Sequence, residues 1–200
     1  MINAFKSTPE IFLYASNMFS MPLAEQTHRE WIINVTLEKF ALGGGGEVRF
    51  YLGPPKMQVA DHPDTSANVG SFVICADAPT DCPNCQQQAD NKMEIGGTVE
   101  LTDALIKYRL PLTLPDAVTF LKQHLRWHIR TNDKKEIPVE AVPSLKVLVQ
   151  SVGYVTYFEL IDGKIKEMET VREEWISHTE VTEGKAGGVK TEAEFYSMTE

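Results

Sequence analysis

The stretch Glu30-Trp-Ile-Ile-Asn-Val-Thr-Leu-Glu-Lys39 decides the structural class of this chain. Apolar side chains stand at every second position from Trp31 to Leu37, and polar side chains such as Asn34 and Thr36 fall between them. An alternation with a period of two is typical of a strand that buries one face and exposes the other. The stretch therefore predicts a half-buried strand, with Trp31 in the core.

Similar patterns lie on both sides of this strand. The glycines 43–46 indicate a tight hairpin turn into a second strand at 47–52, which Gly53-Pro-Pro55 ends because proline cannot donate to a ladder. Further strands are predicted at 69–76, 97–101, 124–130, 145–152 and 154–160, with weaker ones at 164–169 and 175–181, and short helices at 102–107 and 115–121. Many short strands with few helices indicate a mainly β protein, an antiparallel β-sandwich or barrel with one or two short helices.

Three regions differ in pattern along the chain. Residues 1–27 mix polar and apolar side chains without a clear period, and we interpret them as an N-terminal extension. Residues 28–188 carry the strand patterns and form the predicted domain. Residues 189–200 are rich in glutamate and have few apolar positions, so we expect an acidic tail that folding does not need.

Composition excludes several classes of function. The 200 residues include 28 acidic and 19 basic side chains, which gives a net charge of −9. Binding to nucleic acid or to an anionic membrane needs clustered cations and is not expected. The sequence has no apolar run of about 18 residues and no secretory signal at its start. Its three cysteines suit a reducing compartment, so we expect a cytoplasmic protein.

The motif Cys82-Pro-Asn-Cys85 is the one compact chemical motif in the sequence. Two cysteines separated by two residues can hold a soft metal such as Cu(I) between their thiolates, or cycle between dithiol and disulfide. An incidental surface loop explains the same residues, and both interpretations remain open.

A basic stripe follows the second predicted helix. His124, Arg126, His128 and Arg130 alternate with the apolar residues Leu125, Trp127 and Ile129. This alternation predicts a strand with Trp127 in the core and the basic side chains on the opposite face. Such a face could hold an anion, and a plain solvated strand face fits the pattern as well.

Several segments, taken in order, resemble the C-terminal domain of fungal tyrosinases. They cover roughly residues 28–188 and are Arg29–Lys39, Ala41–Gly44 with Phe50–Gly53, Val69–Ser71, Cys82–Gln86, Leu101–Leu105, Leu121–Trp127, Val142–Val147 and Thr182–Gly188. In that family the domain is a β-sandwich that covers the entrance to the copper site of the catalytic domain. The resemblance implies that this chain shields or copper-loads a separate tyrosinase catalytic domain in trans.

The same resemblance implies roles for individual residues. Cys82 and Cys85 would handle copper as transient Cu(I), and no tightly bound cofactor is expected. The covering residue would come from the segment Ser71-Phe-Val-Ile-Cys75, in which we nominate Phe72, although Cys75 stands where an aromatic residue is usual.

The histidine count separates this chain from a complete tyrosinase. The binuclear copper site of that family uses six imidazoles, whereas this sequence has five histidines, so it is not expected to oxidise phenols by itself. The chain also begins with its own methionine, which suggests either a separate shield or a sandwich recruited to another task.

If the sandwich has been recruited to another task, that task could be enzymatic. The chain could be a cofactor-free isomerase, cyclase or dehydratase of fungal secondary metabolism that binds a small aromatic or polyketide substrate in a pocket of the sandwich. The candidate catalytic residues are chosen by residue type and are His124, Arg126, His128 and Glu159. A third alternative is an interaction module without chemistry.

Overall fold

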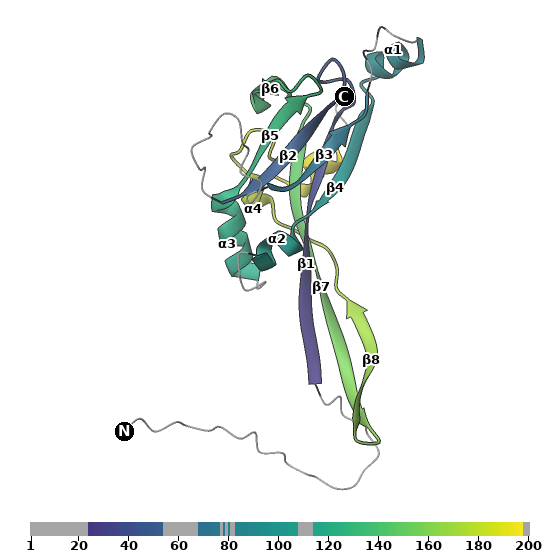
Figure 1. The fold of residues 1–200 in the computed structure, drawn as a ribbon, viewed down its shortest axis with the longest axis vertical. Helices are drawn as coiled ribbons and strands as arrows, with labels where there is room; N and C mark the ends of the chain where they lie inside the picture. Colours follow the sequence, from purple (N-terminus) through teal and green to yellow (C-terminus); the bar gives the residue numbers. More distant parts are fainter. Residues whose placement is uncertain are drawn as a thin grey trace, which may run out of the picture.

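The computed structural model describes residues 24–53, 68–76, 78, 80, 83–107 and 114–197, which form two antiparallel sheets and several short helices (Figure 1). The first sheet has the order β4-β1-β7-β8, with β9 also paired to β7, and the second has the order β3-β2-β5-β6. The strands are β1 Ala24–Glu38, β2 Gly46–Leu52, β3 Asn68–Ile74, β4 Glu94–Glu100, β5 Leu125–Thr131, β6 Glu136–Ile137, β7 Lys146–Ile161, β8 Lys164–Arg172 and β9 Ile176–Ser177. The helices are α1 Pro83–Asp90, α2 Thr102–Lys107, α3 Leu114–His124, η2 Val139–Ala141, α4 Thr179–Thr182 and α5 Glu192–Tyr196. The predicted class, mainly antiparallel β structure with a few short helices, is confirmed.

The core lies between the two sheets and uses the predicted strand faces. Every second position of β1 from Trp31 to Leu37 is fully buried. Val48, Phe50 and Leu52 of β2 face them from the second sheet, beside Trp127 of β5. The phase predicted for the two tryptophans is therefore confirmed.

The glycine turn does not close a hairpin as the sequence suggested. β1 pairs with β4 and β7, whereas β2 pairs with β3 and β5, so the glycines 43–46 carry the chain from one sheet to the other. A Cβ on Gly45 would lie 2.9 Å from the Ile74 carbonyl oxygen, which explains the need for glycine at this crossing. Alternation along a strand identifies its buried face but not its neighbour.

The predicted helices are both present, and α3 is longer than expected. It continues through His124, so strand β5 starts one residue later than predicted, at Leu125. Helix α1 was not expected and buries none of its side chains. The predicted strand at 175–181 is only the two-residue β9 followed by the short helix α4. No helix among the described residues is both long and apolar enough to cross a membrane.

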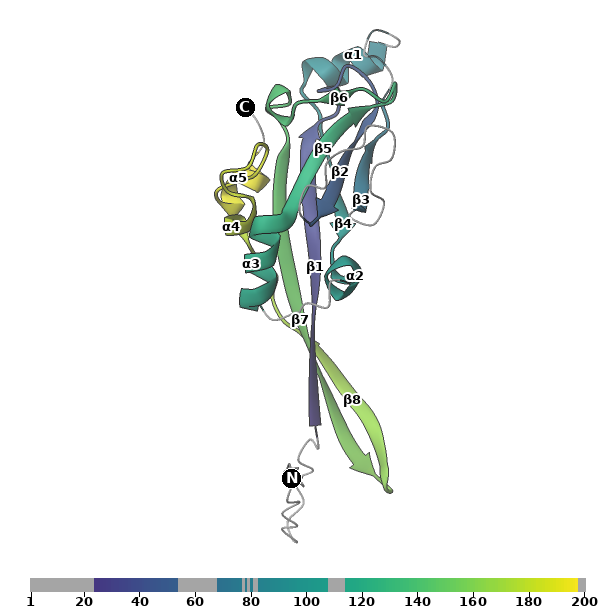
Figure 2. The ribbon, with the colours of Figure 1, turned by 60° about the vertical axis from the view of Figure 1, so that its left-hand side comes forward.

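A narrow arm extends from the body of the protein (Figures 1 and 2). We define the arm as residues 24–29 of β1, 153–161 of β7 and all of β8. β7 is one strand of 16 residues that runs from the core into the arm, where the sequence suggested two strands. In the arm it pairs with β1 on one side and with β8 on the other. All nine residues of β8 are exposed.

A polar clasp lies where the arm meets the body. The Arg29 guanidinium forms an ion pair of 2.7 Å with Glu173, and the Glu173 amide donates to the Gly153 carbonyl at 2.8 Å. A Cβ on Gly153 would overlap the Glu173 carboxylate, so only glycine leaves room for this clasp. The clasp joins β1, β7 and the end of β8 at one point.

The C-terminal residues differ from the expected acidic tail. Phe195 of α5 packs with Leu148 and Val189 in a buried cluster on the outer face of the first sheet. Thr191 caps α5 by accepting from the Glu194 amide, and the Lys146 ammonium donates to the Ser197 carbonyl. Residues 189–197 therefore belong to the packed part of the chain, because one apolar ring is enough to anchor the short helix.

Candidate functional site

The outer face of the second sheet carries most of the predicted basic stripe. Arg126, His128 and Arg130 lie on β5 opposite Tyr51, Arg49 and Glu47 of β2, respectively. Because side chains alternate along a strand, these three cross-strand pairs point away from the core on the same side as each other. His124 is not part of this face, since it ends helix α3.

Cations and a carboxylate surround a shallow pocket on this face. The pocket has a volume of 210 Å³ and is lined by Gly46, Glu47, Arg49, Val73, Arg130, Thr131, Asn132 and Lys134. Glu47 forms an ion pair of 2.5 Å with Arg49, which raises the pKa of that guanidinium. Next to it the Tyr51 and His128 rings meet edge to face, with centroids 5.4 Å apart. This face is suited to holding an anionic group, as the sequence suggested, and the hypothesis stays a prediction.

His124 lies in a seam between α3, β5 and the loop after α4. Its ring packs on Phe120 at 4.6 Å, and its buried Nδ1 has no hydrogen-bond partner among the described residues. Lys185 enters the same seam and donates to the carbonyls of Leu121 and Leu125 at 3.3 and 3.0 Å. Burial, assisted by nearby cations, lowers the pKa of Lys185 to about 8. The seam is thus closed by contacts that stabilise the fold.

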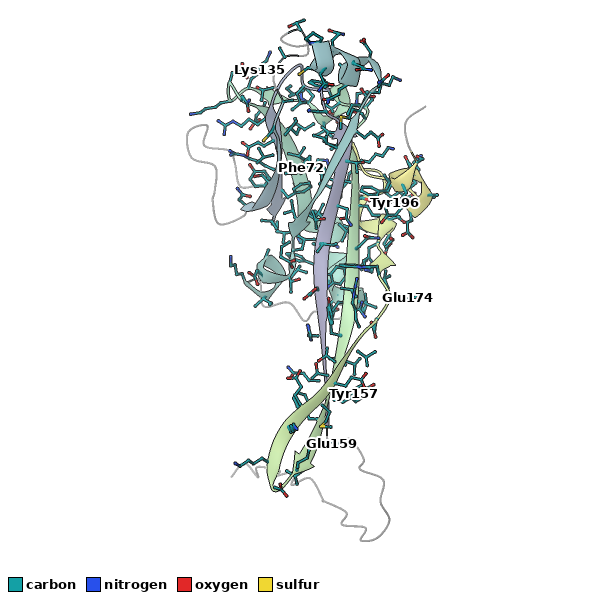
Figure 3. All side chains as sticks on the ribbon, turned by 90° about the vertical axis from the view of Figure 1, so that its right-hand side faces the viewer. Phe72, Lys135, Tyr157, Glu159, Glu174 and Tyr196 are labelled. Carbon is teal, nitrogen blue, oxygen red and sulfur yellow. The ribbon has the colours of Figure 1, made fainter. Side chains whose placement is uncertain are left out.

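Two of the nominated residues lie far apart, Phe72 in the body and Glu159 on the arm (Figure 3). Phe72 of β3 is half-buried, and its ring contacts the place where a Cβ on Gly97 of β4 would be. Glu159 lies on the arm beside Tyr157, well away from Phe72 and Lys135 (Figure 3). The structure does not bring the four candidate catalytic residues together: Arg126 and His128 lie on the outer face of β5, whereas His124 ends α3 and Glu159 lies on the arm.

The cysteine motif is only partly visible. Cys82 lies outside the described residues, and Cys85 on α1 is disulfide-bonded. Cys75 is free and exposed at the end of β3. Copper binding by Cys82 and Cys85 stays a prediction, and it requires the reduced thiolates.

A buried polar network that the sequence did not reveal lies behind Trp31. The Ser151 hydroxyl is 2.8 Å from His178 Nε2, and His178 Nδ1 is 3.5 Å from Glu180. Arg29 donates to the Ser151 oxygen at 3.2 Å, so the hydroxyl can donate to a neutral His178. The Trp31 ring stacks on His178 with centroids 4.8 Å apart.

The order serine, histidine, carboxylate is that of a nucleophile, its base and an orienting acid. Here, however, Ser151 has no exposed surface and His178 is only 4% exposed, so a substrate cannot reach the hydroxyl. The network instead satisfies polar groups buried between β1, β7 and α4. Arg29 lies 122 positions from Ser151 in the sequence, and only the pairing of β1 with β7 brings the two together.

Acid should destabilise the protein through His178. Burial lowers the pKa of His178 in the folded chain, with a smaller opposing effect of Glu180 and a small reinforcing effect of Arg29. The unfolded chain takes up a proton near the ordinary value of 6.5, which the folded chain resists, so the free energy of unfolding falls as the pH drops below 6.5. Urea unfolding of wild type and His178→Gln across this range should show a smaller acid loss in the variant. His28→Gln, on the exposed arm, is the control, and equal acid losses in wild type and His178→Gln would contradict the prediction.

Comparison with known proteins agrees with this fold. The family model of the tyrosinase C-terminal domain matches residues 30–149, more than half of the chain. A tyrosinase of Neurospora crassa is 29% identical over 167 residues, which cover 80% of this chain and 23% of that protein. The solved structure of recombinant mushroom tyrosinase has a TM-score of 0.50 at 14% identity over 80% of this chain and 26% of that one. The Aspergillus oryzae holo-protyrosinase has a TM-score of 0.38 at 14% identity over 71% of this chain and 21% of that one.

The chain thus spans about a quarter of the length of the tyrosinases it matches. The two-sheet fold and the continuous family match over residues 30–149 agree with each other. This chain belongs to the tyrosinase C-terminal domain family.

Proposed function

We propose that this domain acts in trans on a tyrosinase-type catalytic domain. It covers the entrance to the copper site and holds the catalytic domain inactive. The observation that carries the proposal is the family match over residues 30–149. The relatives named above are tyrosinases, and this chain corresponds to only a quarter of their length. In this proposal the chain regulates a reaction that takes place in the catalytic domain.

The placement of the candidate catalytic residues supports the shield over a small-molecule enzyme. An acid–base site needs its groups within hydrogen-bond reach of one substrate. His124 is half-buried against Phe120, Arg126 and His128 lie on the outer sheet face, and Glu159 is on the arm. The four groups therefore do not converge on one site.

The β3 strand offers the side chains for covering an entrance. Phe72, the residue nominated from the family resemblance, is held against Gly97, so its position is fixed before any partner arrives. The next residue, Val73, is 58% exposed and lies on the basic outer face. Because consecutive strand residues point to opposite faces, a partner on the outer face would meet Val73, while Phe72 packs toward the core.

Mixing the chain with a catalytic domain tests the proposal. We expect the purified chain to lower diphenol-dependent oxygen consumption by the Neurospora crassa tyrosinase from which its own C-terminal region has been removed. The chain alone, even with copper added, should consume no oxygen, because its five histidines cannot supply six ligands. Val73→Lys should inhibit less than wild type. Full activity in the presence of excess folded chain would refute the shielding role.

A further inference from the structure

The arm exposes both of its faces and one of its edges. Among the described strands β8 is the outer one of its sheet and pairs only with β7, and each of its nine residues is exposed. A narrow ribbon of this kind has little buried apolar surface of its own and is marginally stable in water. An open edge also presents unpaired backbone donors and acceptors to any other chain. The arm is therefore the part of this domain that most needs a covering partner.

Apolar side chains are concentrated on and beside this arm. Among the described residues, eleven large hydrophobic side chains are exposed, and seven of them lie between Leu160 and Ile176. Ile165 is 70% exposed, Leu160 53% and Met168 49%. Leu160 and Ile165 are cross-strand partners, so their side chains lie side by side and form a small apolar patch near the tip. Contiguous exposed apolar surface of this kind marks an interaction site.

A second copy of this chain is poorly suited to cover the open edge. In an antiparallel pairing of β8 with its own copy centred on Met168, Lys164 would face Arg172. In the same arrangement Glu167 would face Glu169, and like charges directly opposite each other are destabilising. In this register the charge pattern of β8 disfavours a second copy and favours a different protein.

The course of β1 indicates which protein. The family is that of a C-terminal domain, and about three quarters of the matched tyrosinases lie outside the part that this chain resembles. A C-terminal domain is joined to the rest of its protein at its N-terminal end, and β1 is the first strand that the structure describes here. In this chain the first residues of β1 lie on the arm, paired with β7 from Ala24 to His28 (Figure 1).

We propose that the arm is the docking surface for the tyrosinase-type catalytic domain, with Leu160, Ile165 and Met168 as its apolar anchors. This inference rests on the proposed function and adds where the partner is held. Docking at the arm would cover the exposed ribbon and hold the body of this domain beside the catalytic domain.

A matched pair of methionines tests the proposal. Met168 on the arm and Met93 at the far end of the body are 49% and 43% exposed, so replacing either by lysine should leave the stability of the isolated domain nearly unchanged. Binding is measured by calorimetry with the catalytic part of the Neurospora crassa tyrosinase. Loss of an interface anchor weakens binding by roughly 10-fold or more. We expect such a loss for Met168→Lys and for Ile165→Lys, and wild-type affinity for Met93→Lys.

The outcomes separate the two proposals. If wild type does not bind the catalytic part, the shielding function and the arm as its docking surface both fail. If wild type binds and Met168→Lys and Ile165→Lys bind equally well, the arm proposal is overturned while the shielding function stands. If sedimentation shows that wild type self-associates and Ile165→Lys does not, the arm serves a second copy and the proposal is again overturned.

Discussion

Trp31→Ala should leave a chain that is largely unfolded or poorly expressed. Trp31 has no exposed surface, and its ring stacks on His178. Truncating a buried tryptophan costs about 3–5 kcal/mol. That is a large share of the ~5–15 kcal/mol that holds a domain together. The cavity would open between the two sheets, beside the buried polar network.

Trp175→Ala is the matched control. Trp175 is 39% exposed, and its main contact is the Arg172 guanidinium at 5.2 Å from its ring. Its removal should change the free energy of unfolding by less than ~1 kcal/mol. Urea titrations followed by circular dichroism compare both variants with wild type. If Trp31→Ala unfolds at the same urea concentration as Trp175→Ala, the two-sheet core is incorrectly assigned.

Gly188→Ala should be nearly as damaging, although it adds a single methyl group. A Cβ at position 188 would overlap the Thr182 carbonyl oxygen and approach the Lys185 carbonyl at 3.1 Å. These are backbone atoms, which cannot rotate away as a side chain can. Overpacking costs about 1–3 kcal/mol, and we expect the upper end here. The loop would also lose the bridge between Gly188 and Val147 and weaken the bond from Trp127 Nε1 to the Ala186 carbonyl.

Gly44→Ala tests whether this effect is specific to position 188. A Cβ on Gly44 meets nothing within 4 Å, so the change should alter stability by less than ~0.5 kcal/mol. Thermal unfolding of the two variants measures the difference. Equal melting temperatures would show that the loop after α4 has room to rearrange.

Local patterns predicted the strand faces but not the strand partners. The alternation from Trp31 to Leu37 and from Leu125 to Ile129 identified core positions because burial acts on one side of each strand. The pairing of β1 with β7 joins residues more than a hundred positions apart, and no local signal records it. The glycine crossing was mistaken for a hairpin for the same reason.

The site was predictable only where its residues are close in sequence. Arg126, His128 and Arg130 were found because they alternate along one strand. The alternation predicts His124 on the strand because the period of two continues one residue across the junction of α3 and β5, into the last residue of the helix. The contact of Ser151 with His178 and the docking of Phe195 depend on tertiary structure alone. The C-terminal residues resemble an acidic tail in composition. They are nevertheless packed, because the single side chain of Phe195 docks against Leu148 and Val189.

The uninterrupted course of β1 and β7 makes the arm a stiff lever rather than a hinged flap. The 16 residues of β7 span about 53 Å at ~3.3 Å per residue. A pull on the tip would load the β1–β7 ladder in shear along its whole length, so many backbone hydrogen bonds would share the force. The Arg29–Glu173 clasp stiffens the point where a flap would need to bend. A protein held by such a lever would be released by cutting the arm or by dissociating from it, and not by swinging it aside.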